Sequence, residues 1–285
     1  MKQRRALALF SGGLDSILAV KVIQQQGVDV LALNFTSPFF GCSPLEDGEP
    51  LAVQYAQRYN IPIRVIPLGD QYLEMLRKPR YGYGSALNPC IDCKTFMLCR
   101  AKELMPELEA DFIITGEVLG QRPMSQRRDT LRIIERDSGL TGLLLRPLSA
   151  RFMIETVPEA EGWVCREQLP AMKGRGRKEQ IRLAEQLGVD LYPSPGGGCL
   201  LTEESYAPKV QDLLNHLQQP EVRDFELLRL GRHFRLSAGC KAIVGRNHED
   251  NEKIKASSAD NEITMFWPDG GSPLVLLTGQ PEQDD

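Results

Sequence analysis

The fold of this chain is decided by the stretch Ala6-Leu7-Ala8-Leu9-Phe10-Ser11-Gly12-Gly13-Leu14-Asp15-Ser16. Its first five residues form a short apolar run that predicts a buried strand, and residues 16–26 carry the apolar pattern of a helix. Two glycines between them remove side chains where the backbone must turn sharply. The stretch therefore predicts a strand, a tight loop and a helix in immediate succession.

The loop between this strand and helix has the composition of an anion site. Ser11, Ser16 and the first N–H groups of the helix supply hydrogen-bond donors, and Gly12 and Gly13 allow a phosphate to approach closely. Asp15 does not suit a bare anion, but it suits phosphates that are accompanied by Mg²⁺. The loop matches neither G-x-x-x-x-G-K-[ST] nor G-x-G-x-x-G, which excludes the common P-loop and dinucleotide motifs.

Strands and helices continue to alternate beyond the loop. Apolar runs predict strands at residues 30–35, 63–67 and 111–115, and helical patterns cover residues 51–59 and 101–108. This alternation predicts an α/β fold with a doubly wound parallel sheet. Ligands of such sheets bind at the carboxyl ends of the strands, where the loop with Gly12 lies.

The length of 285 residues predicts one large domain and a smaller one. The segment Tyr192-Pro193-Ser194-Pro195-Gly196-Gly197-Gly198-Cys199 cannot continue a regular element, and it places a boundary nearby. We therefore expect a larger domain at residues 1–203, which carries the phosphate loop, and a smaller α+β domain at 204–285. The elements expected in the second domain are a helix at 210–217, a helix from about 221, and strands at 232–236 and 241–244.

Composition and charge exclude several classes of protein. A hydrophobic content of 42% with 25% charged residues is that of an ordinary globular protein, and a net charge of −4 neither requires nor excludes a nucleic-acid partner. The apolar run at residues 6–10 is too short for a signal peptide or a membrane span, so a cytoplasmic protein is expected. Seven cysteines are an odd number and unevenly placed, which argues against a disulfide framework.

Three cysteines stand in positions that suit chemistry. Cys90 and Cys93 form a C-x-x-C that is expected on a turn after Pro89, and Cys199 follows a glycine-rich turn. Three thiolates can hold a [4Fe–4S] cluster with one iron left open, whereas a structural zinc site needs four ligands. A redox pair and a zinc knuckle share the C-x-x-C motif, so the sequence leaves both open.

The other cysteines have plainer interpretations. Cys99, Cys165 and Cys240 are expected to be buried and inert. Cys42 follows the second predicted strand and is a candidate for a further thiol in the active site.

The nucleotide loop resembles a known family signature. Ser11-Gly12-Gly13-Leu14-Asp15-Ser16 is similar to the SGGxDS motif of the PP-loop ATP pyrophosphatases, which have an adenine nucleotide alpha hydrolase-like, Rossmann-like fold. The resemblance implies cleavage of ATP between its α and β phosphates, adenylation of a substrate oxygen and release of pyrophosphate. It also implies nucleotide contacts from Ser11, Gly12, Gly13, Asp15, Ser16, Asn34, Phe35 and the Thr115-Gly116-Glu117 segment.

The order of the remaining motifs resembles the sulfur-transferring branch of this family. The loop is followed by N-P-C-x-D-C-K and then by P-G-G-G-C-L-L-T, as in tRNA 2-thiouridylase and the iron–sulfur-dependent tRNA thiolases. The resemblance implies that Asp15 acts with ATP and Mg²⁺, and that Cys90, Cys93 and Cys199 serve catalysis as ligands of a [4Fe–4S] cluster. If there is no cluster, the second hypothesis is persulfide chemistry between Cys199 and one of the other two cysteines. A site with zinc or with no metal remains an alternative.

The implied reaction replaces the carbonyl oxygen of a tRNA base with sulfur and releases AMP and pyrophosphate. Its partners would be tRNA and a sulfur donor, either sulfide or a persulfide derived from a cysteine desulfurase. No membrane partner is expected. Related enzymes often form dimers, which suggests a homodimer as a hypothesis, but the sequence itself shows no interface. The alternatives are a PP-loop ligase that forms an amide or nitrile and carries structural zinc, sulfur transfer to a small molecule, and a nucleotide-binding RNA module without catalysis.

Basic residues occur in three groups that could contact an RNA backbone or could simply be solvated. In addition, Val244-Gly245-Arg246-Asn247-His248-Glu249-Asp250-Asn251 resembles a segment of the NFACT RNA-binding module of ribosome quality-control proteins. None of the three histidines has metal-ligand spacing with another. The three groups are Arg122, Arg127, Arg128, Arg132 and Arg136; Lys173, Arg175, Arg177, Lys178 and Arg182; and Arg229, Arg232, His233, Arg235, Lys241 and Arg246.

Overall fold

The structure is a computed structural model that describes residues 3–41, 49–194, 198–267 and 270–280. The chain forms two compact units, and the boundary along the chain lies between Gly198 and Cys199. The short segment Ser85–Asn88 belongs to the second unit. Each unit is therefore described on its own.

The first unit is built on a five-stranded sheet in which all the paired strands are parallel. The strand order is β3-β2-β1-β4-β5, so the chain winds outward from β1 in both directions. This confirms the expected doubly wound α/β fold. The strands are β1 (Arg5–Leu9), β2 (Asp29–Thr36), β3 (Ile63–Pro67), β4 (Phe112–Thr115) and the two-residue β5 (Leu144–Leu145).

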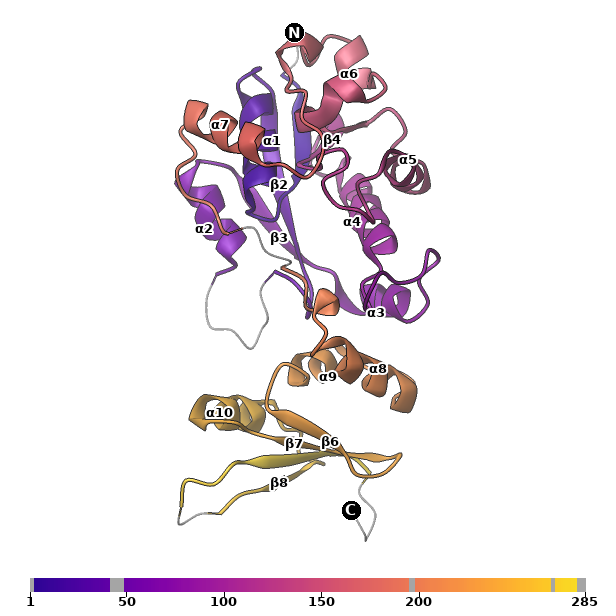
Figure 1. Cartoon of the computed structure of the whole chain (residues 1–285), viewed down its shortest axis with the longest axis vertical. Coiled ribbons are helices and arrows are strands. Elements are labelled where there is room, and N and C mark those ends of the chain that lie inside the picture. Colours follow the sequence, from indigo (N-terminus) through magenta and orange to yellow (C-terminus); the bar gives the residue numbers. More distant parts are fainter. Residues whose placement is uncertain (1–2, 42–48, 195–197, 268–269, 281–285) are drawn as a thin grey trace. The chain divides into compact units, whose positions relative to one another are not determined.

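Helices cover both faces of this sheet, as Figure 1 shows. The central strands are apolar without alternation because both of their faces are buried. Ala6 and Ala8 of β1 face a core shared with Ile17, while Leu7 is fully buried on the other side. The covering helices are α1 (Leu14–Gln24), α2 (Leu51–Arg58) and α7 (Lys178–Gln186) on one face, and α3 (Gly69–Arg77), α4 (Cys90–Leu104) and α5 (Arg128–Asp137) on the other.

After β5 the chain returns toward the carboxyl ends of the strands. It forms the 3₁₀ helix η1 (Pro147–Phe152), the short helix α6 (Val157–Ala160) and the 3₁₀ helix η2 (Arg166–Gln168). It then reaches Lys173, which pairs in parallel with Leu119 just beyond β4. This return brings a late segment of the unit beside the loop that follows β4.

The second unit is an α+β domain with an antiparallel sheet of order β6-β7-β9-β8. Its helices pack on one side of that sheet, where Leu227 and Ile254 meet Ile243 and Leu276 in one apolar cluster. The unit comprises the 3₁₀ helix η3 (Leu200–Thr202), α8 (Ala207–His216), α9 (Val222–Leu227), β6 (Arg232–Arg235), β7 (Cys240–Val244), α10 (His248–Ser257), β8 (Ile263–Met265) and β9 (Val275–Gly279).

A partly buried ion-pair network holds α8 against this sheet. Asp212 accepts hydrogen bonds from Lys241 Nζ at 2.7 Å and from Arg235 Nη2 at 2.8 Å. Burial opposes ionisation of Asp212, but these two hydrogen bonds outweigh it and lower the pKa of the carboxyl group. Arg235 and Lys241, two members of the third basic group, therefore stabilise the domain through these ion pairs.

The structure differs from the sequence prediction at several elements. Helix α1 begins at Leu14, so Asp15 lies in its first turn. The C-x-x-C was expected on a turn, but Cys90 begins α4, because Cys93 N donates to Pro89 O at 2.8 Å and closes a helical turn there. The helix expected at 101–108 is the end of α4, which stops at Leu104. Helices α3, α5, α6 and α10 and strands β5, β8 and β9 were not predicted. No helix in the described ranges has both the length and the apolar character needed to cross a bilayer.

Candidate nucleotide and thiol site

The nucleotide loop lies where the strand order of the sheet reverses. Strand β1 is flanked by β2 on one side and β4 on the other, and Leu9 pairs with both Leu33 and Thr115. The residues after β1 and after β4 therefore leave the sheet side by side at its carboxyl edge. In open parallel sheets this reversal point is where ligands bind.

Two glycines permit the close packing of this edge. A Cβ atom on Gly116 would lie 2.5 Å from the carbonyl of Asp15 and 2.6 Å from the amide nitrogen of Ser16. Gly12 has a φ of +74°, and a Cβ atom there would lie 2.8 Å from the Cα of Ala52 in α2. The segment after β4 thus packs directly on the backbone of the nucleotide loop, and only glycine fits at both positions.

The loop presents donors at the beginning of α1. Ser16 Oγ donates to Gly13 O at 2.8 Å, and Gly13 N donates to Ser11 Oγ at 3.4 Å. Among the residues that the structure describes, no side chain caps the amino end of α1. An uncapped helix start that follows a glycine loop carries the positive end of the helix dipole, which suits a phosphate.

Asp15 is held in place by a partner that the sequence prediction missed. Its Oδ2 accepts a hydrogen bond from Gln121 Nε2 at 2.8 Å, and Gln180 Nε2 donates to Gln121 Oε1 at 3.2 Å. Its Oδ1 is buried and has no hydrogen-bond partner among the described residues. A buried carboxylate oxygen in this state can accept a cation, which is the role that the sequence suggested for Asp15.

Glu117 is the second carboxylate at this edge. Its Oε2 accepts from Arg146 Nε at 3.2 Å and from Thr115 Oγ1 at 3.1 Å, and Lys94 Nζ lies 4.0 Å from its Oε1. Arg146 is almost fully buried and also donates to Glu135 at 3.0 Å. Arg146 carried no sequence signal, because its role depends on partners that lie more than ten residues earlier in the chain.

Asn34 and Phe35 lie where β2 ends and are buried. Asn34 Nδ2 donates to Phe10 O at 2.8 Å and ties the end of β1 to β2. Asn34 Oδ1 is buried without a hydrogen-bond partner in the described part of the chain. The Asn34 amide group thus stabilises the nucleotide loop through Nδ2, while its Oδ1 can accept a hydrogen bond from a ligand.

Cys90 and Cys93 lie one turn apart at the start of α4, so they share one side of the helix. Tyr72, fully buried between Phe40 and Phe96, donates from its hydroxyl to Cys93 Sγ at 3.3 Å. Burial raises the pKa of the Cys93 thiol to about 11, although the hydrogen bond from Tyr72 opposes this rise. Cys93 is therefore a thiol at neutral pH unless a cation stabilises its thiolate.

Cys199 belongs to the second unit, where it precedes η3. Within neither unit do the described residues bring three or more His, Cys, Asp or Glu side chains together as a metal site. Cys42 and residues 195–197 of the P-G-G-G-C motif lie outside the described residues. The expectation of a buried Cys165 is wrong, since this residue is exposed, whereas Cys240 is buried as expected.

Comparison with known protein families accounts for most of the first unit. The family model described as thiamine biosynthesis protein (ThiI) matches residues 1–152. The chain belongs to the ThiI family. This match spans the nucleotide loop, the C-x-x-C of α4 and the Thr115–Glu117 segment, and it confirms the resemblance to the PP-loop thiolation branch.

Curated relatives of this ThiI-family chain are named as tRNA-modifying enzymes. A tRNA-specific 2-thiouridylase MnmA of Syntrophotalea carbinolica is 25% identical over 268 residues, covering 86% of this chain and 69% of the relative. A probable tRNA sulfurtransferase of Thermococcus kodakarensis is 29% identical over 147 residues, covering 51% of this chain and 37% of the relative. The chain thus spans about a third of the length of the second relative.

Among solved structures, one that aligns with this chain is the U34-tRNA thiolase NcsA from Methanococcus maripaludis with its [4Fe-4S] cluster. It is 18% identical, has a TM-score of 0.34, and the likeness covers 83% of this chain and 76% of that one.

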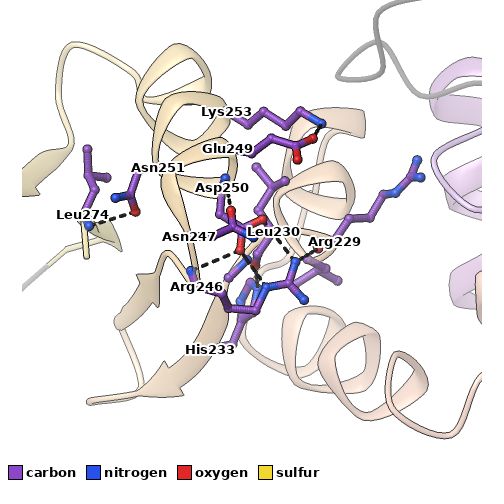
Figure 2. A network of polar contacts seen from close by, with 12 residues as sticks. Arg229, Leu230, His233, Arg246, Asn247, Glu249, Asp250, Asn251, Lys253 and Leu274 are labelled. Carbon is purple, nitrogen blue, oxygen red and sulfur yellow. Dashed lines mark hydrogen bonds and ion pairs between the residues drawn. The ribbon is translucent and has the colours of Figure 1, made fainter. Parts of the chain in front are cut away.

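The end of this ThiI-family chain matches a second model, the NFACT protein RNA binding domain, over residues 231–285. Figure 2 shows the polar network that the resembling segment forms. Arg246 pairs with Asp250, and Asp250 N donates to Asn247 Oδ1 at 2.8 Å, which caps α10. A Cβ atom on Gly245 would lie 2.0 Å from Asn251 Oδ1, so the glycine makes room for this asparagine. The recurring residues of the motif are therefore the ones that shape the turn before α10.

Proposed function

We propose that this chain is an ATP-dependent tRNA sulfurtransferase that adenylates the carbonyl oxygen of a tRNA base and replaces it with sulfur. The observation that carries the proposal is the junction at the β1 and β4 ends, where Gly116 packs on Asp15 beside the uncapped start of α1. The names of the curated relatives supply the substrate class.

ATP would bind with its phosphates against Ser11, Gly12, Gly13 and Ser16. The base oxygen attacks the α-phosphorus and pyrophosphate leaves, so the oxygen becomes part of a good leaving group. Hydrosulfide, or the outer sulfur of a cysteine persulfide, then attacks the base carbon, and AMP departs with the original oxygen. In the persulfide case a second cysteine thiol then attacks the inner sulfur, which breaks its bond to the sulfur on the base and forms a disulfide. The task of the chain is to orient the α-phosphate and the base and to stabilise the charge that develops on the phosphates.

Mg²⁺ fits the acidic groups at this edge. Asp15 and Glu117 each have one buried carboxylate oxygen with no hydrogen-bond partner among the described residues. Asp15 would hold the ion, and Gln121 fixes the orientation of its carboxylate. Mg²⁺ supplies charge neutralisation for the leaving pyrophosphate.

We propose Cys90, Cys93 and Cys199, the thiols that the sequence singled out, as ligands of a [4Fe–4S] cluster. Desolvation raises the pKa of Cys93, and a metal cation bound to its sulfur would offset that rise, which is compatible with the role of a metal ligand. A cluster bound by three cysteines leaves one iron open to an exogenous sulfur ligand.

The second unit would bring the RNA substrate to the first one. Its match to an RNA-binding model supports this role. Arg235, Lys241 and Arg246 are engaged in ion pairs within the unit, so exposed members of the basic group, such as Arg232, are better candidates for RNA contacts.

The substitution Gly13→Ala tests the nucleotide site without disturbing the fold. A Cβ atom on Gly13 would meet only Ser11 Oγ at 3.4 Å, and the φ of −74° suits alanine. The methyl group would occupy the space of the phosphates, so we expect KM for ATP to rise at least ~10-fold, equivalent to about 1.4 kcal/mol. Thionucleoside formation measured by mass spectrometry, with AMP and pyrophosphate release, is the readout.

The same assay decides between the alternatives. If the wild-type protein forms no thionucleoside from ATP, sulfide and tRNA, the proposed function is wrong. If the activity survives treatment with ribonuclease, the sulfur acceptor is a small molecule. A Gly13→Ala variant with unchanged KM for ATP and unchanged Tm would place the nucleotide elsewhere.

Metal analysis tests the cluster. Protein purified without oxygen is expected to contain about four irons and four acid-labile sulfides per chain, in keeping with a cluster of this type. Cys93→Ser and Cys199→Ala should lose both, whereas Cys165→Ala, at an exposed position away from the motif, should retain them. Zinc in place of iron, or a colourless metal-free protein, would contradict the cluster and favour the persulfide or ligase interpretation.

A further inference from the structure

A groove of about 480 Å³ lies between α5, β5 and the segment that carries Met153 and Ile154. Its α5 wall bears Arg128, Arg132 and Arg136, which are exposed and spaced four residues apart, so they lie along one side of the helix. The facing wall is apolar at Met153 and Ile154, and Ile154 is 70% exposed. Such a groove suits an anionic ligand that also carries apolar surface.

The charge on the α5 wall is largely uncompensated. The Arg132 guanidinium has no hydrogen bond or ion pair with any residue that the structure describes, and Arg128 donates to the neutral carbonyl of Phe152 at 2.8 Å. Arg136 alone of the three pairs with a carboxylate, that of Asp137, at 2.7 Å. Three like charges along one helix face repel one another, so an anion bound across them would relieve this repulsion.

The carboxylates that line the groove do not cancel this charge. Glu135 is engaged by Arg146 at 3.0 Å, and Glu159 pairs with Arg166. Glu155, on the apolar side, is the exposed carboxylate in the lining. The groove thus keeps a cationic wall that faces a mainly apolar one.

The tertiary structure joins this groove to the second basic segment. Lys173 Nζ lies 4.8 Å from the centre of the Phe152 ring, and the carbonyl of Phe152 accepts the hydrogen bond from Arg128. The backbone of Lys173 also forms a parallel β-bridge with that of Leu119, and Gly174 N donates to Leu119 O at 2.7 Å. Two residues farther along, Gln121 holds Asp15. The cations therefore form a track from α5 to the loop that borders the nucleotide site.

We propose that an unpaired stretch of the RNA substrate binds in this groove and enters the nucleotide site past Lys173. Its phosphates would lie on Arg128, Arg132 and Arg136, and its riboses or bases would contact Met153 and Ile154. The arginine row spans about 12 Å along the helix, long enough to contact more than one phosphate of the strand. Proteins that bind single strands combine a cationic groove along the backbone with side chains, usually aromatic, against which the bases pack. Here the aliphatic side chains of Met153 and Ile154 would provide that surface. The inference rests on the proposed function and adds the route by which the strand reaches the site.

The double substitution Arg128→Gln/Arg132→Gln tests the groove. We expect about 10-fold weaker binding of tRNA at about 0.1 M salt, and a salt slope shallower by about 1.4, since each phosphate contact on a single strand contributes about 0.7. The matched control is Arg64→Gln/Arg100→Gln, which removes the same charge from exposed arginines of the first unit that pair with Glu107 and Glu103. The control should retain the wild-type affinity and slope, and Tm should show that both variants are folded.

Site-specific cross-linking gives a readout that does not depend on charge. A photoreactive amino acid at Ile154 should cross-link to bound tRNA, whereas the same group at Val65, which is 40% exposed on β3, should not. Equal cross-linking from both positions would overturn the proposed route.

The outcomes separate this inference from the proposed function. Wild-type protein that binds and thiolates tRNA, together with an Arg128→Gln/Arg132→Gln variant that binds as tightly and with the same salt slope, overturns the groove alone. Poly-L-glutamate that displaces oligouridylate from the wild type at equal charge concentration would assign the groove to an acidic peptide and also overturn it. If the wild-type protein binds no RNA at all, both the proposed function and the RNA groove are contradicted.

Discussion

Gly116→Ala is expected to lower ATP-dependent turnover about 100-fold. The added Cβ atom would lie within 2.6 Å of backbone atoms of Asp15 and Ser16, and backbone cannot move aside as a flexible side chain can. The nucleotide loop would have to shift away from β4 by a few tenths of an ångström or more, and misplacement of about 1 Å in a catalytic constellation can cost 10²-fold. Overpacking of this kind also destabilises a protein by about 1–3 kcal/mol.

The measurement combines steady-state kinetics of AMP release with thermal unfolding. Gly176→Ala is the matched control, because Gly176 has no atoms near its would-be Cβ and no positive φ. The control should keep its Tm and its turnover. A Gly116→Ala variant that turns over at the wild-type rate would show that the close packing of the two segments is not needed for catalysis.

Arg146→Met is expected to destabilise the first unit by about 3–5 kcal/mol. The arginine side chain is 2% exposed and links Glu117, Glu135 and the carbonyl of Leu131. Methionine fills a similar volume but leaves the buried Glu117 carboxylate without its hydrogen-bonded cation and with the more distant Lys94 at 4.0 Å, and removing one partner of a buried ion pair carries a cost of this size. The free energy of unfolding from urea denaturation is the measurement.

Two further variants show whether charge burial is the cause. Arg64→Met removes an arginine from the exposed pair with Glu107 and should cost less than about 1 kcal/mol. Arg146→Met/Glu117→Gln should recover part of the loss, because the second change removes the uncompensated charge. A loss in Arg146→Met no larger than that in Arg64→Met would contradict the assigned role of the network.

The sequence predicted the architecture of the first unit because its signals are local. The apolar run at β1, the glycines that follow it and the helix after them lie within about twenty residues, and their order alone indicates a strand, a phosphate loop and a helix. The parallel sheet followed from the repetition of that pattern.

The local conformation of the C-x-x-C was less well predicted. The motif was expected on a turn because Pro89 interrupts the chain, whereas Cys90 starts a 15-residue helix in the structure. Proline is tolerated just before the first helical turn, so it marked the beginning of this helix. The environment of Cys93 depends on Tyr72, twenty-one residues earlier, and that contact leaves no pattern in the sequence.

The sequence by itself determined the fold class, the position of the nucleotide loop and the set of residues that suit ATP and sulfur chemistry. Each of these depends on short stretches of contiguous residues. Only the tertiary structure decided which distant groups support them. Gln121 and Gln180 orient Asp15, Arg146 neutralises Glu117, and Phe152 joins the α5 arginines to Lys173. The physical reason is that hydrogen bonds and ion pairs act over a few ångströms in space, and the winding of the sheet decides which segments come that close.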